Sequence, residues 1–498
     1  MKKSVIKLMM ISGLVLTMFG CSDDFINEAP ESGFQTINQF GDIAASNPDI
    51  LSGFIEGVYS NMYTTGTGGT GGHDDFGHKA YDLFADFLTS DVALSVSTYG
   101  WYRASITEYQ CTEDFTFTDN YQVWRHYYRV IRSANTVIDA LGGEAADPEN
   151  ETNRANLGQA LGMRAHSYFY LTQYMSNDYN PSAEILPIYR GVSNIGVGKS
   201  TTAEVFALIE SDLNRAIELT ANYTRPTKTQ VDKTVAKAML AYAIAATRDV
   251  SRLGEVVALC DAVIAESGAT IMSAAEVTGG FNNLATPGWI WGVDLNPDIG
   301  LRLVSWWGQM DAFSYSYAWA GDAKAIDQNL YDAIPADDAR KAQFFPGTGY
   351  YNLMPLDKFY DASRIIGGPS GTVVADYVYM RIAELHMLKA ESLAKMGQDG
   401  AARTALANIL DQRLPDTSYL NGLSGTALLD EIHLQTRIEF WGEGKSYLSL
   451  KRNQMMTGAR GSNHLSFVGE SFAHNSEQMT FEIPELEIQS NVFINDQN

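Results

Sequence analysis

Apolar residues recur at intervals of three and four along most of the chain, which is the spacing of one face of an α-helix. The clearest case spans residues 121–141, where Trp124, Tyr127, Ile131 and Ile138 fall on one face. This pattern predicts a mainly helical protein. The predicted helices cover residues 51–63, 81–91, 121–141, 155–174, 202–219, 233–247, 253–266, 377–395, 400–412, 428–440 and 446–452.

The predicted helices follow one another in pairs, with small residues where two helices would cross. Residues 377–413 hold two helices around a Gly-Gln-Asp-Gly turn at 397–400, much like a tetratricopeptide hairpin, whose repeat is about 34 residues long. Comparable pairs span 121–175 and 202–248, and insertions of unequal length separate them. Stacked helix pairs would form a rigid scaffold with a long face. The alternative is a generic helical bundle.

Four long segments between the helices lack a helical period. They cover residues 64–80, 92–120, 268–375 and 453–498, and they hold most of the tryptophans. Loops of this length are uncommon in compact domains unless they carry function. The order of elements therefore favours a helical scaffold with elaborated loops, which is how many binding proteins are built.

The first residues have the layout of a secretory signal. Three lysines lie within the first seven residues, and an apolar run follows over 8–19, too short to span a bilayer comfortably. Cys21 directly follows Gly20, an arrangement that resembles the lipobox of bacterial lipoproteins and implies acylation of Cys21. We therefore predict a signal peptide over 1–20 and a lipidated tether over 21–45. Two acyl chains would anchor the protein stably. The alternative is a secreted protein with a buried cysteine near its start.

Charge and cysteine content limit the possible partners. The chain has 35 Lys and Arg against 59 Asp and Glu, a net charge of −24 at pH 7. We therefore predict no nucleic-acid partner, because Lys and Arg bind phosphates, and no polybasic membrane-docking face. Only Cys111 and Cys260 accompany Cys21, without a disulfide framework or a CxxC pattern. We expect neither a cofactor nor a metal.

Residues 193–200 come close to a phosphate-binding P-loop. They read Ser-Asn-Ile-Gly-Val-Gly-Lys-Ser, with Ser193 where the pattern needs glycine. Pro187 interrupts the preceding apolar run, which suits a central strand badly. We interpret the segment as a loop before a helix that begins at Thr202.

The segment 66–78 is rich in glycine and contains possible metal ligands. His73, Asp74, Asp75 and His78 offer nitrogen and oxygen donors. Their spacing fits neither a zinc signature nor an EF-hand. A flexible, solvated glycine loop is the favoured interpretation.

Catalytic motifs give no support for an enzyme. The sequence contains no GxSxG, no HExxH and no catalytic-cysteine signature. Asp86 and Asp91 could be imagined as the carboxylate pair of a glycosidase, but an acidic chain offers many such pairs. We predict that the protein is not an enzyme, with a surface hydrolase as the alternative from another class.

Two aromatic clusters in the insertions are the best functional signal. Sugar rings present apolar C–H faces that stack on aromatic rings, while their hydroxyl groups need polar partners. We therefore predict Gln309 and Asp311 as polar ligand contacts. The candidate aromatic platform consists of Tyr99, Trp101, Tyr102, Trp306, Trp307, Tyr315, Tyr317 and Trp319.

The alternative for these rings is that they pack the loops onto the scaffold. The alternation of aromatic and small residues over 315–319 also suits a strand, so core and ligand roles stay open for 306–319. Trp124 lies on a helix face, and we assign it to the core together with Trp289 and Trp291.

Short segments along nearly the whole chain share the order and spacing of one family. Cys21 precedes Asp23 and Asp24, and further segments lie at 128–135, 162–171, 204–217, 234–241, 381–391 and 437–444. Together they resemble the SusD/RagB family of Bacteroidetes surface lipoproteins. The acidic pair resembles the export tag of such lipoproteins.

The resemblance implies a mainly α, tetratricopeptide-like scaffold of helix pairs with a loop-rich ligand-binding half. It implies one domain over 46–498, with an N-terminal part at about 46–248 and a C-terminal part at about 249–498. In position, the family's sugar-binding loops correspond to those that carry Trp101 and 306–319.

The resemblance also implies a role at the cell surface. It implies a lipoprotein anchored through Cys21 in the outer membrane, which captures oligosaccharides and delivers them to a SusC-like TonB-dependent transporter. The alternative within the family is a RagB-like protein that captures peptides. The shared segments are scaffold residues, so no catalytic role follows from them.

Overall fold

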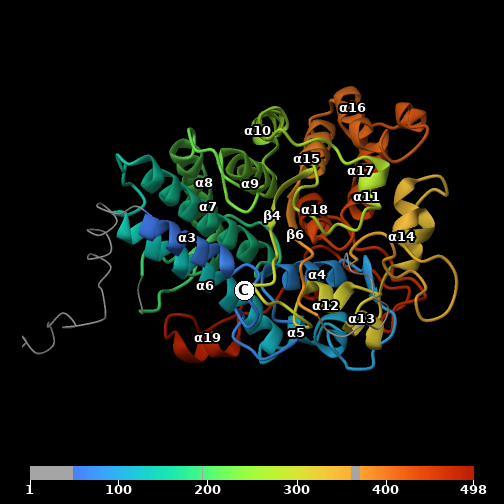
Figure 1. Cartoon of the computed structure of the whole chain (residues 1–498), viewed down its shortest axis with the longest axis horizontal. Coiled ribbons are helices and arrows are strands. Elements are labelled where there is room, and N and C mark those ends of the chain that lie inside the picture. Colours follow the sequence, from blue (N-terminus) through green and yellow to red (C-terminus); the bar gives the residue numbers. More distant parts are fainter. Residues whose placement is uncertain (1–48, 193–194, 361–370) are drawn as a thin grey trace, which may run out of the picture.

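Helices form most of the regular structure in the computed structural model, which confirms the predicted mainly α class (Figure 1). The structure describes residues 49–192, 195–360 and 371–498. Cys21 and its tether lie outside them. The long helices are α3 (Asp49–Ser60), α4 (His78–Leu88), α6 (Thr118–Ala140), α7 (Glu151–Tyr174), α8 (Thr202–Leu219), α9 (Lys233–Ala246), α10 (Leu253–Glu266), α15 (Ile382–Lys395), α16 (Asp399–Leu410), α17 (Gly425–Glu439) and α18 (Lys445–Asn453).

Short elements occupy the insertions between the long helices. Three two-stranded antiparallel sheets pair β1 (Val92–Leu94) with β5 (Lys324–Ile326), β2 (Glu184–Leu186) with β3 (Ser200–Thr201), and β4 (Trp289–Val293) with β6 (Tyr377–Arg381). The short α-helices are α5 (Gln110–Glu113), α11 (Ala274–Val277), α12 (Trp306–Met310), α13 (Tyr317–Ala320), α14 (Gln328–Ala333) and α19 (Glu485–Ser490).

The long helices pack in the pairs that the sequence predicts. Helix α6 packs on α7, α8 on α9 and α15 on α16, and the contacts of α7 with α8, α9 with α10 and α10 with α15 join the pairs into one scaffold (Figure 1). One large apolar core runs beneath the scaffold and the insertions, and a smaller one lies between α15, α16 and α17. Within the described ranges, no helix is both long and apolar enough to cross a bilayer.

Helix α8 begins where its sequence predicts. The Thr201 hydroxyl accepts a hydrogen bond from the Glu204 backbone N–H at 3.2 Å, and the Glu204 carboxylate accepts from the Thr201 N–H at 2.8 Å. This capping box satisfies donors that a helix start leaves unpaired. Ser200 and Thr201 form β3 directly before the helix, whereas residues 193 and 194 of the P-loop-like segment lie outside the described part.

The predicted helix over 377–395 is wrong at its start, because residues 377–381 form strand β6. Aromatic and β-branched residues such as those of Tyr377–Arg381 suit a pleated, buried strand. The strand pairs with β4, with Trp289 opposite Arg381 and Val293 opposite Tyr377. Trp289 is fully buried; Trp291 and Trp124 are also buried, so the predicted core positions of these tryptophans are confirmed.

Arg164 on α7 ties three helices together from a buried position. Its guanidinium donates two hydrogen bonds of 2.7 Å to the Asp212 carboxylate on α8, one of 3.0 Å to Asn135 Oδ1 on α6, and one of 2.8 Å to Glu144 Oε2. Charged side chains are seldom buried unless they are paired in this way. Asn135, Arg164 and Asp212 all come from segments that carried the family resemblance, so those segments specify the scaffold.

A second buried network joins the C-terminal helices to the long insertion before β6. Arg381 donates to Glu443 Oε2 at 2.7 Å and to Glu439 Oε1 at 3.0 Å. Arg413, after α16, donates to Glu439 Oε1 at 2.9 Å, and Lys358 of the insertion donates to Glu443 Oε1 at 2.8 Å. The network therefore fixes how the insertion sits on the helices.

The glycine-rich segment 66–78 is not the solvated loop that its composition predicts. The buried Asp75 carboxylate accepts hydrogen bonds from the Gly68 N–H at 2.8 Å, and from the Thr70 N–H and hydroxyl at 3.0 Å each. These bonds replace water at the backbone, because glycines let the chain fold closely around the carboxylate. The segment is thus folded back on itself before α4 begins at His78.

Candidate functional site

The sheet of β1 and β5 brings the two predicted aromatic clusters together. Beyond the paired strands, the Thr98 N–H donates to the Gly321 carbonyl at 3.0 Å. The Asp322 carboxylate accepts hydrogen bonds from the Thr98 N–H at 2.6 Å and from the Tyr99 N–H at 2.8 Å. The loop that carries Tyr99 and Trp101 is therefore attached to the segment that follows α13, more than two hundred residues later in the chain.

Five of the predicted rings and one histidine gather at this junction, and we call them the aromatic surface. Tyr99 and Tyr315 are the most exposed, at 57% and 43%. The Tyr317 ring meets Tyr99 edge-on at 5.4 Å between centroids and Trp101 at 5.9 Å. The members are His73, Tyr99, Trp101, Tyr315, Tyr317 and Trp319.

From the sequence, His73 is a candidate only for metal binding, but the structure places it against the aromatic rings. The imidazole is nearly parallel to the Trp101 ring, with 5.5 Å between centroids and 5° between planes. Its Nδ1 lies 2.6 Å from the Tyr317 hydroxyl. The stacking contact of His73 with Trp101 and its hydrogen bond with Tyr317 hold these two side chains in fixed relative positions. The only sequence signal for this role was the length of the insertion that contains His73.

Gln309 supports the aromatic surface from below. Its side chain is fully buried, donates to the His73 carbonyl at 2.9 Å and accepts from Lys324 Nζ at 2.9 Å. Burial lowers the pKa of Lys324 to about 7, and the Tyr102 ring lies 5.2 Å from its ammonium nitrogen. Gln309 therefore holds the His73 backbone in place, and it does not reach the surface as the predicted polar ligand contact would need.

Four further predicted ligand residues are buried, which corrects their role in an exposed platform. The Trp306 ring packs edge-on against Phe359 at 5.1 Å between centroids, and Trp307 Nε1 donates to the Ala375 carbonyl at 2.6 Å. Tyr102 packs on Phe87 at 5.2 Å between centroids. Asp311 accepts hydrogen bonds within its own turn from the Phe313 N–H at 2.9 Å and from Ser314. The buried residues are Tyr102, Trp306, Trp307 and Asp311.

The alternating stretch 315–319 is not a strand, because helix α13 begins within it at Tyr317. The Ser316 hydroxyl accepts from the Trp319 N–H at 3.0 Å and so caps the helix start. Tyr350 adds a hydrogen bond from its hydroxyl to the Ala318 carbonyl. The short helix thereby holds Tyr315, Tyr317 and Trp319 next to the loop of Trp101.

The groups considered for metal binding or hydrolysis do not form such sites in the described ranges. No three His, Cys, Asp or Glu side chains converge there. Asp86 and Asp91 are fully buried; Asp86 accepts from the Gly444 N–H at 3.0 Å, and Asp91 pairs with Arg437 at 2.7 Å. Neither carboxylate can flank a sugar at the surface. The four candidate ligands of the 66–78 segment each form hydrogen bonds with different residues. His73 bonds to Tyr317 and His78 to Tyr127. Asp74 accepts from Gln122, and Asp75 accepts from Gly68 and Thr70.

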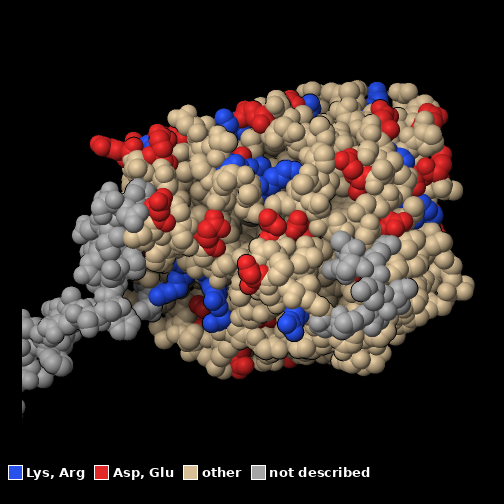
Figure 2. Space-filling view, in the orientation of Figure 1, with Lys and Arg blue, Asp and Glu red and all other residues tan. Residues whose placement is uncertain are grey.

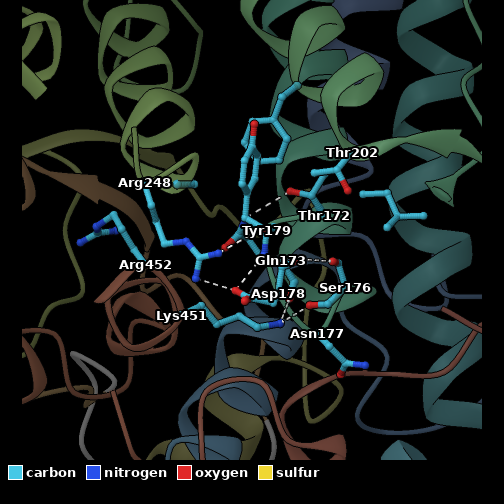
Figure 3. A pocket seen from close by; sticks show the side chains of 13 residues that line it. Thr172, Gln173, Ser176, Asn177, Asp178, Tyr179, Thr202, Arg248, Lys451 and Arg452 are labelled. Atoms are coloured by element: carbon cyan, nitrogen blue, oxygen red, sulfur yellow. Dashed lines mark hydrogen bonds and ion pairs between the residues drawn. The ribbon is translucent and has the colours of Figure 1, made fainter. Parts of the chain in front are cut away.

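A small polar cavity lies where the ends of α7, α9 and α18 meet the start of α8 (Figure 3). Its volume of about 30 Å³ gives room for water but not for a sugar. Arg248 pairs with Asp178 at 2.5 Å, and Lys451 Nζ donates to the carbonyls of Gln173 at 2.5 Å and Ser176 at 2.6 Å. These groups pair with one another, so the cavity has a structural role.

Family models match both parts of the chain. A model described as starch-binding associating with outer membrane matches residues 70–244, which include the loop of Trp101. A model of the SusD family matches residues 282–491, which include α12 and α13. No curated protein sequence gives a significant match.

Solved structures share the fold over nearly the whole chain. A SusD-like carbohydrate-binding protein from Bacteroides vulgatus is 24% identical, with a TM-score of 0.74 over 90% of this chain and 97% of its own. A SusD superfamily protein from Bacteroides thetaiotaomicron is 20% identical, with a TM-score of 0.73 over 90% and 99%. Surface glycan-binding protein A from Bacteroides thetaiotaomicron is 14% identical, with a TM-score of 0.69 over 90% and 98%.

The shared fold fits the structural role of the two buried networks around Arg164 and Arg381. The residues behind the resemblance, among them Arg164 and Arg381, hold together the scaffold that the solved structures share. The family consists of non-catalytic binding proteins, in line with the sequence's lack of hydrolase motifs. Two models of one family cover most of the sequence, and the fold matches its solved members. The chain therefore belongs to the SusD/RagB family.

Proposed function

We propose that this protein is a glycan-binding lipoprotein of the cell surface, and that oligosaccharides bind at the aromatic surface. The observation that carries the proposal is the exposed group of rings around Tyr317, assembled from three insertions and supported from below by Gln309. Exposed ring faces favour stacking of pyranose rings, and the tyrosine hydroxyls offer hydrogen bonds to sugar hydroxyls.

The relatives support a carbohydrate ligand. One solved structure with this fold is named a SusD-like carbohydrate-binding protein, and another is named a surface glycan-binding protein. The model that matches residues 70–244 is described as starch-binding and associated with the outer membrane. We extend these properties to this chain as part of the proposal.

The test is calorimetric titration of an oligosaccharide panel against wild type, Trp101→Ala and Tyr419→Ala. Loss of one stacked ring should weaken binding by about 1–3 kcal/mol, by analogy with bases stacked on aromatic side chains. Tyr419 is a matched control, because it is 43% exposed but lies just before α17, outside the aromatic surface. No binding by wild type, or equal binding by Trp101→Ala, would refute the proposed site.

We further propose that Cys21 anchors the protein in the outer membrane beside a SusC-like TonB-dependent transporter, to which it delivers the captured oligosaccharide. Two acyl chains anchor stably, and a net charge of −24 disfavours docking by charge. Replacing Cys21 by Ala should release the protein from membranes and leave glycan affinity unchanged. A Cys21→Ala protein that stays on membranes lacking the transporter would contradict the anchor.

A further inference from the structure

A second cavity lies between α6 and α19, away from the aromatic surface. Figure 1 shows α19 beneath α6, on the other side of the view from α12 and α13. The cavity volume is about 460 Å³, within the range of about 300–1,000 Å³ that small-molecule sites occupy. Residues of α6 at spacings of three and four form one wall, and residues of α19 form the other.

The walls of this cavity are held together by hydrogen bonds between distant segments. Trp124 Nε1 on α6 donates to Glu487 Oε2 on α19 at 3.2 Å. The Tyr128 hydroxyl donates to the Pro187 carbonyl at 2.9 Å, and Asn135 Nδ2 donates to the Tyr189 carbonyl at 2.9 Å. The cavity is therefore formed before any ligand arrives, which lowers the entropic cost of binding.

Aromatic rings form one corner of the cavity. The Tyr128 ring lies 4.8 Å from Trp124 and 5.8 Å from Tyr189 between centroids, and the two tyrosine rings are almost perpendicular, at 85°. Trp124 is almost fully buried, whereas the half-buried rings of Tyr121, Tyr128 and Tyr189 offer accessible aromatic area. Rigid amphipathic rings of this kind suit the apolar face of a pyranose.

The charges around the rings favour a ligand with acidic groups. Arg125 and Arg132 line the same wall, seven residues apart on α6, which corresponds to roughly 10 Å along a helix. Arg125 donates a hydrogen bond to the Thr67 carbonyl at 3.4 Å, and its guanidinium lies 6.0 Å from the centroid of the Tyr121 ring. Glu487, the one carboxylate among the lining residues, accepts from Trp124 and, at 2.8 Å, from Asn491 Nδ2.

This local excess of positive charge stands out in a chain with a net charge of −24. Figure 2 shows Lys and Arg side chains gathered at the level of α6, above α19, on a face where Asp and Glu are otherwise more frequent. Arginine binds carboxylates in a fixed planar geometry. A long polyanion such as nucleic acid would be repelled by the rest of the surface, whereas a short acidic ligand would contact the cavity alone.

We propose that the cavity between α6 and α19 is a second binding site, and that it takes a uronic-acid oligosaccharide. The rings of Tyr128 and Tyr189 stack on the sugar, and Arg132 pairs with a carboxylate. This site is separate from the aromatic surface, and it does not depend on which glycan binds there.

The test is calorimetric titration with trigalacturonic acid and with its carboxyl-reduced counterpart, galactotriose. The acidic trisaccharide should bind better than the neutral one, and added salt should weaken its binding. Arg132→Gln should lower the affinity for trigalacturonic acid roughly fivefold, the strength of an exposed ion pair. Arg129→Gln is the matched control, because Arg129 lies on α6 but does not line the cavity, and it donates to Asn61 Oδ1.

Three outcomes would overturn the inference. One is that trigalacturonic acid does not bind, or binds no better than galactotriose. Another is an equal loss in Arg129→Gln and Arg132→Gln, which would mean a general charge effect. The third is tighter binding of triglutamate, which would make the cavity a peptide site. Trp101→Ala should leave trigalacturonic acid binding unchanged; if that variant abolishes it, the acidic sugar binds at the aromatic surface and this inference fails independently of the proposed function.

Discussion

Two neighbouring aromatic residues at the candidate site differ in exposure because of one backbone angle. Tyr102 has a left-handed φ of 68°, and its ring is 1% exposed against Phe87. Trp101, one residue earlier, remains partly exposed beside His73. Left-handed backbone is uncommon for residues other than glycine. The turn at Tyr102 thus decides which ring serves the core and which one can meet a ligand.

Arg164 allows a test of burial at the scale of one residue, because it pairs with two carboxylates in different surroundings. The Asp212 side chain is 3% exposed and the Glu144 side chain is 39% exposed. Asp212→Ala should lower the free energy of unfolding by about 3–5 kcal/mol, since it leaves a buried charge without its main partner. Glu144→Ala should cost less than about 1 kcal/mol, as exposed pairs do.

Urea unfolding of both variants measures this difference. The sequences differ from wild type by one carboxylate each, so the unfolded chains lose the same charge. Equal costs for Asp212→Ala and Glu144→Ala would mean that burial does not govern the strength of these pairs.

At the scale of elements, the sheet of β1 and β5 positions the aromatic surface, and Gly321 is the point of closest approach. A Cβ atom at Gly321, where φ is 136°, would lie 2.4 Å from Thr98 Oγ1. Gly321→Ala should therefore push away the 98–101 loop and weaken glycan binding. Calorimetric titration measures the effect.

Gly397→Ala is the control for backbone strain in that experiment. Gly397 also has a positive φ, of 72°, but a Cβ there would meet nothing within 4 Å. Gly397→Ala should cost roughly 1–2 kcal/mol of stability through its left-handed φ and leave affinity unchanged, whereas Gly321→Ala should cost at least as much and also lower affinity. An equal loss of affinity in both variants would argue against the sheet as the positioning element.

The long helices could be predicted from sequence because their apolar faces repeat over many turns. Strand β6 could not, since Tyr377–Arg381 is short and continues into α15 without a break in the apolar pattern. At the site, the positions of the aromatic insertions were informative, but the burial of Trp306 and Gln309 depends on tertiary neighbours that no local pattern encodes. His73 was missed because its partner Tyr317 is 244 residues away.

For the whole molecule, two buried groups with opposite pKa shifts contribute to stability in opposite pH ranges. Burial would raise the pKa of Glu443, but its ion pairs with Arg381 and Lys358 outweigh burial and lower it to about 2, from 4.5. Burial, together with the nearby Asp119 carboxylate, raises the pKa of Asp74 from 3.8 to about 7. The first group favours folding when it is ionised, and the second when it is protonated.

The contributions of the two groups therefore depend on pH in opposite directions. The contribution of Glu443 is fully present above pH 4.5 and is lost as the pH falls toward 2, whereas that of Asp74 is fully present below pH 3.8 and is lost as the pH rises through 7. In urea unfolding, the free energy of unfolding of wild type should fall relative to that of Asp74→Asn as the pH rises from about 4 to 7, because only wild type must ionise a buried carboxyl group there. Below about pH 4 the free energies of wild type and Asp74→Asn should change in parallel, because Asp74 is protonated in the folded and unfolded chain there. Free energies that also change in parallel between pH 4 and 7 would contradict the raised pKa of Asp74.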